Sequence, residues 1–349
     1  MIQIKGVWTA LVSPVRSDLS LDIPGLEKNV EFQISQGVTG VVPTGTTGES
    51  PTLDWNEHNE IILRVLTQCK GRCGVLAGTG SNSTAETVDG TKLAVAAGAE
   101  AILMVDCYYN GPSTQELRDD YYGALASMFP GLSVVPYIIP GRSGTALAVE
   151  DLAILAGKYP NINTVKEATG DLDRMAKTRS LVGDSFSIVS GDDDLTFKMM
   201  TDPSIRANGV ISVMSNIIPG AIVRMVGAID AGDAETAAKV RDAIAPLLGI
   251  VTVKVDNERT LPNGQVVKVN DRYRNPLAVK TLMAALGMPS GPCRQPLGKM
   301  TMAGVDVVRT AVRTVWESNP EVLEPVAHFY HVDLGARIAD DSIWKSLAC

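Results

Sequence analysis

GVTGVVPTG, residues 37–45, is a short apolar run that ends in proline and glycine, and the same pattern recurs along most of the chain. The other runs are GVWTALVSP (6–14), GVLAGTG (74–80), AILMVD (101–106), SVVPYI (133–138), INTVKEAT (162–169), SFSIVSG (185–191) and GVISV (209–213). Such continuous apolarity is typical of parallel strands that are buried on both faces. Helix-start signals lie between the runs, such as Asp54 with Glu57 three residues later, and Ser83 before a second helical stretch.

This alternation of strand-like and helix-like segments predicts an α/β protein. Eight units of this kind predict a (β/α)8 TIM barrel followed by C-terminal helices. The alternative is a doubly wound sheet, which usually has a glycine-rich dinucleotide-binding turn after its first strand. Here that turn reads SPVRSDLS (13–20), without the required glycines, so the pattern favours the barrel.

Beyond about residue 216 the strand pattern stops, and three regions are expected. These are a catalytic barrel over 1–220, a helical region over 221–302, and an additional helix and tail over 303–349. Within the second region, VTVKVDNERTLPNGQVVKV (251–269) has two alternating runs around Pro262-Asn263-Gly264, which predicts a protruding hairpin.

The last helical stretch is amphipathic, with Val305, Val308, Val312, Val315 and Trp316 on one face. This face predicts a helix that docks on the rest of the protein. A less regular tail is expected to follow it to Cys349.

The composition restricts the class of protein. Hydrophobic residues make up 45% and charged residues 20%, as in a globular protein able to bury a core. The net charge is −8 without a basic patch, so nucleic acid is not an expected partner. Five scattered cysteines favour a reducing compartment over a disulfide framework. The N-terminal residues do not resemble a signal peptide and no run of 18 apolar residues occurs, so a cytoplasmic protein without a membrane segment is expected.

Lys166 is the most informative single residue, because it lies in an otherwise uncharged strand that is expected to be buried. Two interpretations are open. The lysine either extends from a strand end to solvent, or it is an amine inside the barrel. Desolvation would lower the pKa of an interior amine and leave it nucleophilic, as in enzymes that form a Schiff base with a ketone.

Hydroxyl groups are the candidate proton carriers at the C-terminal ends of the strands, where TIM barrels build their active sites. Tyr137, Thr46 and Tyr109 lie at such ends, and no histidine does. They could form a proton relay for enamine chemistry. Taken singly, a tyrosine there is also common as packing, and the loop Gly45–Gly48 is also common as a simple turn.

Anion-binding and metal-binding candidates complete the residue analysis. Arg142 could clamp a carboxylate in bidentate fashion, or form a surface salt bridge. Thr46 and Thr47, in a glycine-flanked turn, could hold a second carboxylate. The run Asp192–Asp194 could bind a metal or cap the following helix. The cap is the favoured interpretation, because no histidine is near, and no metal is expected.

Together these strand ends resemble the dihydrodipicolinate synthase / N-acetylneuraminate lyase family over about residues 5–300. The matching pieces are GTTGES (45–50), AGTGSNSTAE (77–86), YYNGPS (108–113), Tyr137 with PGRSG (140–144), VKEATGD (165–171), SGDD (190–193) and GVISV (209–213). The resemblance implies a TIM barrel that condenses pyruvate with aspartate-β-semialdehyde in lysine and diaminopimelate biosynthesis. It also implies a homotetramer or dimer, and no cofactor.

The resemblance also implies roles for individual residues. It makes Lys166 the Schiff-base lysine and makes Tyr137, Thr46 and Tyr109 the proton relay, with Tyr109 reaching the partner subunit's site. It assigns the pyruvate carboxylate to Thr47. The remaining positions are implied as follows: Arg142 binds the carboxylate of the aldehyde, and Gly191 and the Ile211 carbonyl line the pocket.

Lysine inhibits many members of this family at the tight-dimer interface. The matching positions here are Ser50, Trp55, His58, Asn82, Glu86 and Tyr108. The alternative is that Trp55 and Tyr108 only pack the interface and that Glu86 is a solvated helix residue.

Three features depart from the family pattern. Ile138 follows Tyr137 where the family usually has asparagine, the hairpin at 251–269 has no usual counterpart, and the chain runs beyond the usual end. These departures leave two other functions open: another pyruvate-dependent aldolase or 2-keto-acid dehydratase-aldolase, and a non-catalytic protein that binds a keto acid.

Overall fold

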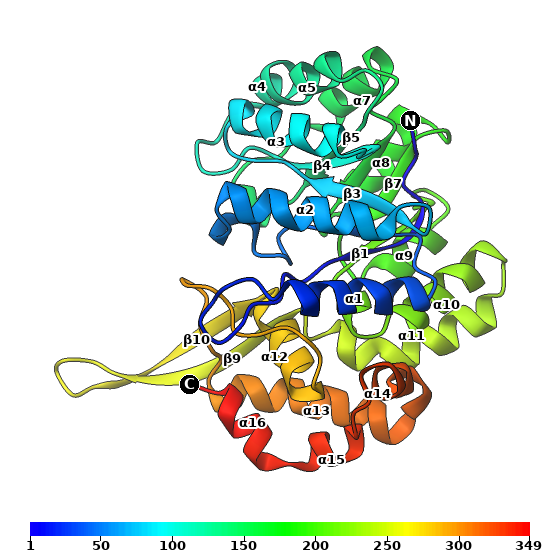
Figure 1. Cartoon of the computed structure of the whole chain (residues 1–349). Helices are drawn as coiled ribbons and strands as arrows, with labels where there is room; N and C mark the ends of the chain where they lie inside the picture. The colour runs from blue at the N-terminus through cyan, green and yellow to red at the C-terminus, as the bar shows by residue number, and fades with distance from the viewer.

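The computed structural model describes all 349 residues, and eight parallel strands close into a barrel in the order β1 to β8. The barrel strands are β1 Gly6–Ala10, β2 Gly40–Val42, β3 Gly74–Gly78, β4 Ala101–Val105, β5 Ser133–Ile138, β6 Thr164–Glu167, β7 Ser187–Ser190 and β8 Gly209–Ser212. Each predicted apolar run contains one of these strands, so the predicted TIM barrel is confirmed (Figure 1).

Helices follow the strands and surround the barrel (Figure 1). Those of the barrel region are α1 Ile23–Ser35, α2 Trp55–Cys69, α3 Thr84–Ala96, α4 Thr114–Glu116, α5 Gly123–Met128, α6 Pro140–Ser143, α7 Val149–Lys158, α8 Leu172–Val182, α9 Thr196–Thr201 and α10 Pro219–Asp230, with the 3-10 helices η1 Ser50–Thr52 and η3 Met214–Asn216 and the π-helix η2 Leu117–Tyr122. The expected starts are confirmed, because Asp54 and Glu57 form a reciprocal capping box on α2 and Ser83 caps α3.

The interior of the barrel is a packed layer of side chains rather than a channel. Trp8 fills one part of it and lies against Gly40 and Gly74 on the neighbouring strands. A Cβ atom at Gly40 would lie 2.3 Å from the Trp8 ring, and one at Gly74 would lie 2.4 Å from it. The indole therefore requires glycine at both positions.

The predicted hairpin is present and projects from the body of the molecule (Figure 1). Its strands are β9 Thr252–Thr260 and β10 Val266–Arg274, which pair along their whole length from Thr252↔Arg274 to Thr260↔Val266. The second strand continues beyond the expected end at 269. This extension carries Arg272 and Arg274 back to the base of the hairpin.

The predicted helices after the barrel are also present. They are α11 Ala234–Leu248, α12 Leu277–Leu286 and α13 Met302–Ser318. Val305, Val308, Val312 and Val315 are buried as the amphipathic pattern of α13 predicts, and Trp316 is half-buried. The docked helix is therefore confirmed.

The expectation of a less regular tail is wrong. The segment folds into η4 Pro320–Val322, α14 Glu324–Tyr330, α15 Leu334–Ala339 and α16 Asp341–Leu347. Tyr330 donates its hydroxyl to Asn29 of α1 at 2.9 Å, and Trp344 is fully buried. Each helix is one or two turns long, so no helical periodicity builds up in the sequence, and packing stabilises them instead. None of the helices is long and apolar enough to cross a lipid bilayer.

Candidate active site

Lys166 and Tyr137 lie side by side inside the barrel. Lys166 is on β6 and Tyr137 on β5, and they are direct partners in the register of these strands. Partner residues on neighbouring strands point to the same face, so both side chains reach the interior. Lys166 Nζ lies 4.0 Å from the centre of the Tyr137 ring. Lys166 is 5% exposed, which makes it an interior amine and rules out the solvent-exposed alternative.

Burial controls the charge of Lys166. The loss of hydration is the largest influence and lowers the pKa of Lys166 to about 8, against an opposing effect of Asp192 and Asp193. The positive charge of Arg142 lowers the pKa further. A usable fraction of this amine is therefore neutral near pH 7, and the neutral form is the nucleophile.

Tyr137 and Thr46 form a second pair of groups. Burial raises the pKa of Tyr137 to about 12, while Arg142 and a hydrogen bond with Thr46 act in the opposite direction. Tyr137 therefore keeps its proton near neutral pH and can donate it. The third hydroxyl, that of Tyr109, is not part of this pair. Tyr109 is 91% exposed and has a left-handed backbone conformation with φ of 77°.

A cavity of about 640 Å³ opens at the C-terminal ends of the barrel strands. The barrel residues that line it include Thr46, Thr47, Tyr137, Arg142, Lys166, Gly191 and Asp192, and the later residues are Val251, Thr252, Lys254, Arg272, Arg274 and Asn275. A second cavity of about 250 Å³ shares Thr46, Tyr137 and Arg142 and continues to Ser50 and Tyr108. Lys166 borders only the larger cavity, which is therefore where a carbonyl substrate can meet the amine.

Thr47 and Arg142, the two carboxylate-binding candidates, meet at Asn275. Asn275 Nδ2 donates to Thr47 Oγ1 at 3.0 Å, and Arg142 donates to the Asn275 carbonyl at 2.9 Å. Asn275 Oδ1 is buried and has no hydrogen-bond partner, so a ligand or water that donates there is favoured. Arg142 has no carboxylate partner, which removes the salt-bridge alternative. Burial, and to a lesser degree Arg274, lower the pKa of Arg142, which remains a cation.

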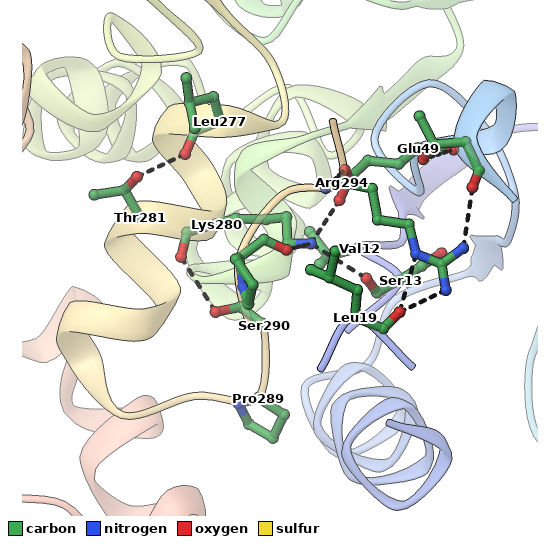
Figure 2. Close-up of polar contacts among 12 residues, drawn as sticks. Val12, Ser13, Leu19, Glu49, Leu277, Lys280, Thr281, Pro289, Ser290 and Arg294 are labelled. Atoms are coloured by element: carbon green, nitrogen blue, oxygen red, sulfur yellow. Dashed lines mark hydrogen bonds and ion pairs between the residues drawn. The ribbon is translucent and has the colours of Figure 1, made fainter. Parts of the chain in front are cut away.

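A buried ion pair anchors the loop that carries Thr46 and Thr47. Figure 2 shows Lys280 of α12 directed at Glu49, which follows this loop. Lys280 Nζ lies 2.5 Å from Glu49 Oε1 and also donates to the carbonyl of Pro292 at 2.8 Å. The other carboxylate oxygen of Glu49 accepts from the backbone N–H of Arg294 at 2.8 Å. These contacts hold Glu49 in a left-handed conformation with φ of 57°, which a non-glycine residue adopts only under constraint.

Gly191 lies directly against Lys166, whereas Ile211 is not among the residues that line the cavity, and the role of its carbonyl stays a prediction. A Cβ atom at Gly191 would lie 3.0 Å from Lys166 Cε and 2.7 Å from Ala168 Cβ, so the lysine needs glycine there. Ile211 on β8 packs in the apolar interior of the barrel. At that strand end it is Val213 that lines the cavity.

The acidic run Asp192–Asp194 does not cap the following helix, contrary to expectation. α9 begins after Leu195 and no side chain caps it. Asp193 instead accepts backbone N–H groups of Val213 at 2.8 Å and Met214 at 3.3 Å, so it ties β7 to the end of β8. Asp192 lines the cavity, and burial raises its pKa to about 6. No group of three or more His, Cys, Asp or Glu side chains is arranged to bind a metal ion.

The residues matched to a lysine site fall into two sets. Ser50 and Tyr108 line the smaller cavity, and Tyr108 lies near Ser81, Asn82 and Glu86, while burial raises its pKa. Ser81 links these groups, because its hydroxyl donates to Glu86 at 2.5 Å.

Trp55 and His58 form the other set and do not line either of these cavities. Their rings lie 4.8 Å apart, and His58 is buried with both ring nitrogens unpartnered. Burial lowers the pKa of His58 to about 4, so its imidazole is neutral.

Several site residues were missed by the sequence analysis. Asn275 and Lys280 carry no motif, and Glu49 lies in the GTTGES motif without an assigned role; the roles of all three depend on contacts across more than 200 residues of chain. Lys254 lies in the predicted hairpin, and Arg272 and Arg274 lie just beyond its predicted end, but no sequence signal indicated that the base of the hairpin lines the cavity.

Comparison with known proteins agrees with this geometry. The model of the dihydrodipicolinate synthetase family matches residues 3–314. The 4-hydroxy-tetrahydrodipicolinate synthase of Geobacter sulfurreducens is 39% identical over 297 residues, which cover 85% of this chain and 93% of that protein.

Two solved structures are similar in sequence and fold. Dihydrodipicolinate synthase from Cyanidioschyzon merolae with lysine bound is 32% identical, with a TM-score of 0.79, covering 89% of this chain and 98% of that one. The chloride-inhibited enzyme from Acinetobacter baumannii in complex with pyruvate is 31% identical, with a TM-score of 0.78, covering 90% and 99%.

Proposed function

Because the chain belongs to the dihydrodipicolinate synthetase family, we propose that it is a lyase that condenses pyruvate with L-aspartate-β-semialdehyde. The product is 4-hydroxy-tetrahydrodipicolinate, on the route to diaminopimelate and lysine. The single observation that carries this proposal is the buried Lys166 amine beside the Tyr137 ring in a cavity lined by hydroxyls and an arginine.

The first step is imine formation. The neutral amine of Lys166 attacks C2 of pyruvate, and the carbonyl oxygen leaves as water once it has been protonated. Thr47 and the neighbouring amide of Asn275 are placed to receive the pyruvate carboxylate, since both line the same cavity as Lys166. The resulting iminium acidifies the C3 methyl group, because it can accept the electron pair that remains after deprotonation.

The second step is carbon–carbon bond formation. Loss of a C3 proton gives the enamine, and its C3 attacks the aldehyde carbon of the semialdehyde. Tyr137 supplies a proton to the developing alkoxide, and Thr46 provides the next hydroxyl in the relay. The α-amine of the semialdehyde then attacks C2, closes the ring and releases Lys166, so that one water is lost overall.

Arg142 is the group we assign to the carboxylate of the semialdehyde. It lines the cavity, has no carboxylate partner within the chain, and lies beside both Tyr137 and Asn275. A guanidinium with free N–H groups binds a carboxylate in bidentate fashion.

Tyr109 requires a second subunit in this scheme. Its ring is exposed and its backbone is held in a left-handed conformation, which suits a residue that completes the site of a partner. We therefore propose that the active species is a homo-oligomer of at least two chains.

The test is turnover with pyruvate plus L-aspartate-β-semialdehyde, compared with pyruvate plus sugar-like aldehydes. We expect efficient turnover with pyruvate plus the semialdehyde and not with pyruvate plus the sugar-like aldehydes. The Lys166→Ala variant should show no turnover with either acceptor. A preference for the sugar-like aldehydes would indicate a different pyruvate aldolase. If neither acceptor reacts although the protein binds pyruvate, the proposed enzymatic function is wrong.

A further inference from the structure

The base of the β9–β10 hairpin forms one wall of the catalytic cavity. Thr252 and Lys254 of β9, together with Arg272 and Arg274 of β10, line the 640 Å³ cavity that also contains Lys166 and Arg142. The hairpin reaches the barrel through a direct contact, because Arg274 donates to the carbonyl of Gly141 at 2.6 Å. Gly141 is the residue before Arg142, so the hairpin borders the proposed acceptor-binding loop.

The strand register puts all the cavity-facing residues of the hairpin on one face. Lys254 is paired with Arg272 and Thr252 with Arg274, and residues two apart on a strand share a face. The opposite face packs on α13: Val253 is buried, and Thr301 at the start of α13 donates its backbone N–H to the Tyr273 hydroxyl at 3.3 Å. The helix thus holds the basic face of the hairpin toward the cavity.

The acidic residues of this face, Asp256 and Glu258, lie farther out and form no ion pair with Lys254 or Arg272. Lys254 and Arg272 lie directly opposite each other, and like charges in that position destabilise a strand pair. Neither residue forms an ion pair, and neither do Arg274 and Arg142, although the chain forms 15 salt bridges elsewhere. Asp256, the next acidic residue outward on this face, accepts a hydrogen bond from Asn270 instead.

Four cations without an ion-pair partner, against the single carboxylate of Asp192 in the same cavity, favour an anionic ligand with more than one charge. Arg142 and Arg274 are already held by backbone carbonyls at the inner edge, whereas Lys254 and Arg272 are exposed and free to bind. We propose that Lys254 and Arg272 form a second anion subsite beside the acceptor position, which binds ligands that carry another anionic group besides the one bound by Arg142. This rests on the proposed function, which assigns Arg142 to the carboxylate of the acceptor; aspartate-β-semialdehyde has only that one carboxylate and leaves the second subsite to other dianionic ligands.

Binding to the trapped enzyme tests the proposal without requiring turnover. The protein is incubated with pyruvate and borohydride, and then titrated by calorimetry with pentanoate and with glutarate. These five-carbon ligands differ in having one carboxylate or two. We expect glutarate to bind at least tenfold more tightly than pentanoate, and we expect Lys254→Gln/Arg272→Gln to remove this difference while pentanoate affinity stays unchanged.

The matched control is Lys268→Gln. Lys268 lies on the same face of the hairpin but farther out, opposite Glu258, and it does not line the cavity. This variant should keep the wild-type preference for glutarate. Equal affinities in the wild type, or a preference that survives in the double variant, would overturn the proposal. If no pyruvate adduct forms, the proposed function fails, and the same titrations on the unmodified protein still decide whether the subsite exists.

Discussion

Two buried lysines have opposite surroundings in this protein, and the contrast explains which one is reactive. Lys280 is held by the Glu49 carboxylate and by backbone carbonyls, so its amine is occupied by these partners. Lys166 has no carboxylate in contact and lies against an aromatic face. Burial therefore makes a lysine nucleophilic only where no carboxylate lies in contact with it.

The rate of adduct formation should follow the pKa of Lys166. We expect pyruvate with cyanoborohydride to label this residue at a rate that rises with pH and levels off near an apparent pKa of about 8, because only the neutral amine attacks. Peptide mass spectrometry at each pH gives the rate, and Lys280 serves as the unlabelled internal control. A rate that keeps rising toward pH 10.5, the ordinary lysine value, would show that burial does not activate Lys166.

Substitutions of Tyr137 and of Arg142 should impair different kinetic parameters. Tyr137→Phe keeps the ring but removes the proton donor, so turnover should fall about 10²–10⁴-fold. Arg142→Ala removes charge-assisted hydrogen bonds worth about 1.5–3 kcal/mol, which should appear in the apparent affinity for the semialdehyde. Steady-state kinetics with each substrate varied in turn distinguishes the two. Equal damage to pyruvate and semialdehyde affinity in Arg142→Ala would remove Arg142 from its assigned role.

At the scale of elements, the loop after β2 depends on α12 for its shape. Thr46 and Thr47 precede Glu49, and Glu49 is fixed by Lys280 and by the backbone of Arg294 (Figure 2). The loop therefore draws its rigidity from a helix that follows it by more than two hundred residues. Helix α13 supports the hairpin base in a similar way through Tyr273.

Removing one partner of the buried ion pair should be costly. Lys280→Met leaves the Glu49 carboxylate buried without its cation, and we expect a loss of about 3–5 kcal/mol in the free energy of unfolding. Denaturant unfolding followed by circular dichroism measures the loss. The double variant Glu49→Gln/Lys280→Met should recover part of it, since no charge then remains buried. No recovery would indicate that packing of the lysine stem, rather than charge, is what Lys280 contributes.

At the scale of the whole molecule, the proposed relay is incomplete within one chain. Tyr137 and Thr46 lie at the cavity, while the ring of Tyr109 extends into solvent. Its exposure is difficult to explain in a monomer, because a large aromatic ring exposed by a constrained backbone costs free energy.

Subunit complementation tests the proposed assembly. Lys166→Ala and Tyr109→Phe should each be nearly inactive alone, and mixing them under conditions that exchange subunits should restore about one quarter of wild-type activity. The reason is that half of the dimers are mixed, and each mixed dimer has one site with both residues intact. Activity in the mixture that equals the sum of the separate variants would show that Tyr109 does not act across subunits.

Regulation by L-lysine is the second expectation at this scale. Glu86 could pair with the ammonium group of lysine, and Tyr108 lies between Glu86 and the cavity that contains Tyr137. We expect millimolar L-lysine to lower turnover, and we expect Glu86→Ala to relieve the inhibition. Calorimetry without a binding signal in the wild type would leave Trp55 and Tyr108 as packing residues.

The sequence by itself determined the barrel, the starts of α2 and α3, the hairpin, and the strand ends that carry Lys166, Tyr137 and Thr46. These features depend on local patterns: apolar runs, capping residues and turn residues all act over a few positions. Parallel-strand topology then forces the C-terminal ends of the strands to one side.

Only the tertiary structure decided that Lys166 has no ion-pair partner whereas Lys280 has one. It likewise decided that Asn275 contacts Thr47 and that Asp193 connects β7 to β8. It also decided that the tail is helical and that the hairpin base lines the cavity. These features depend on contacts between residues far apart in the chain. Charge, burial and hydrogen bonding at such contacts are set by what each residue meets in space, which no local pattern in the sequence records.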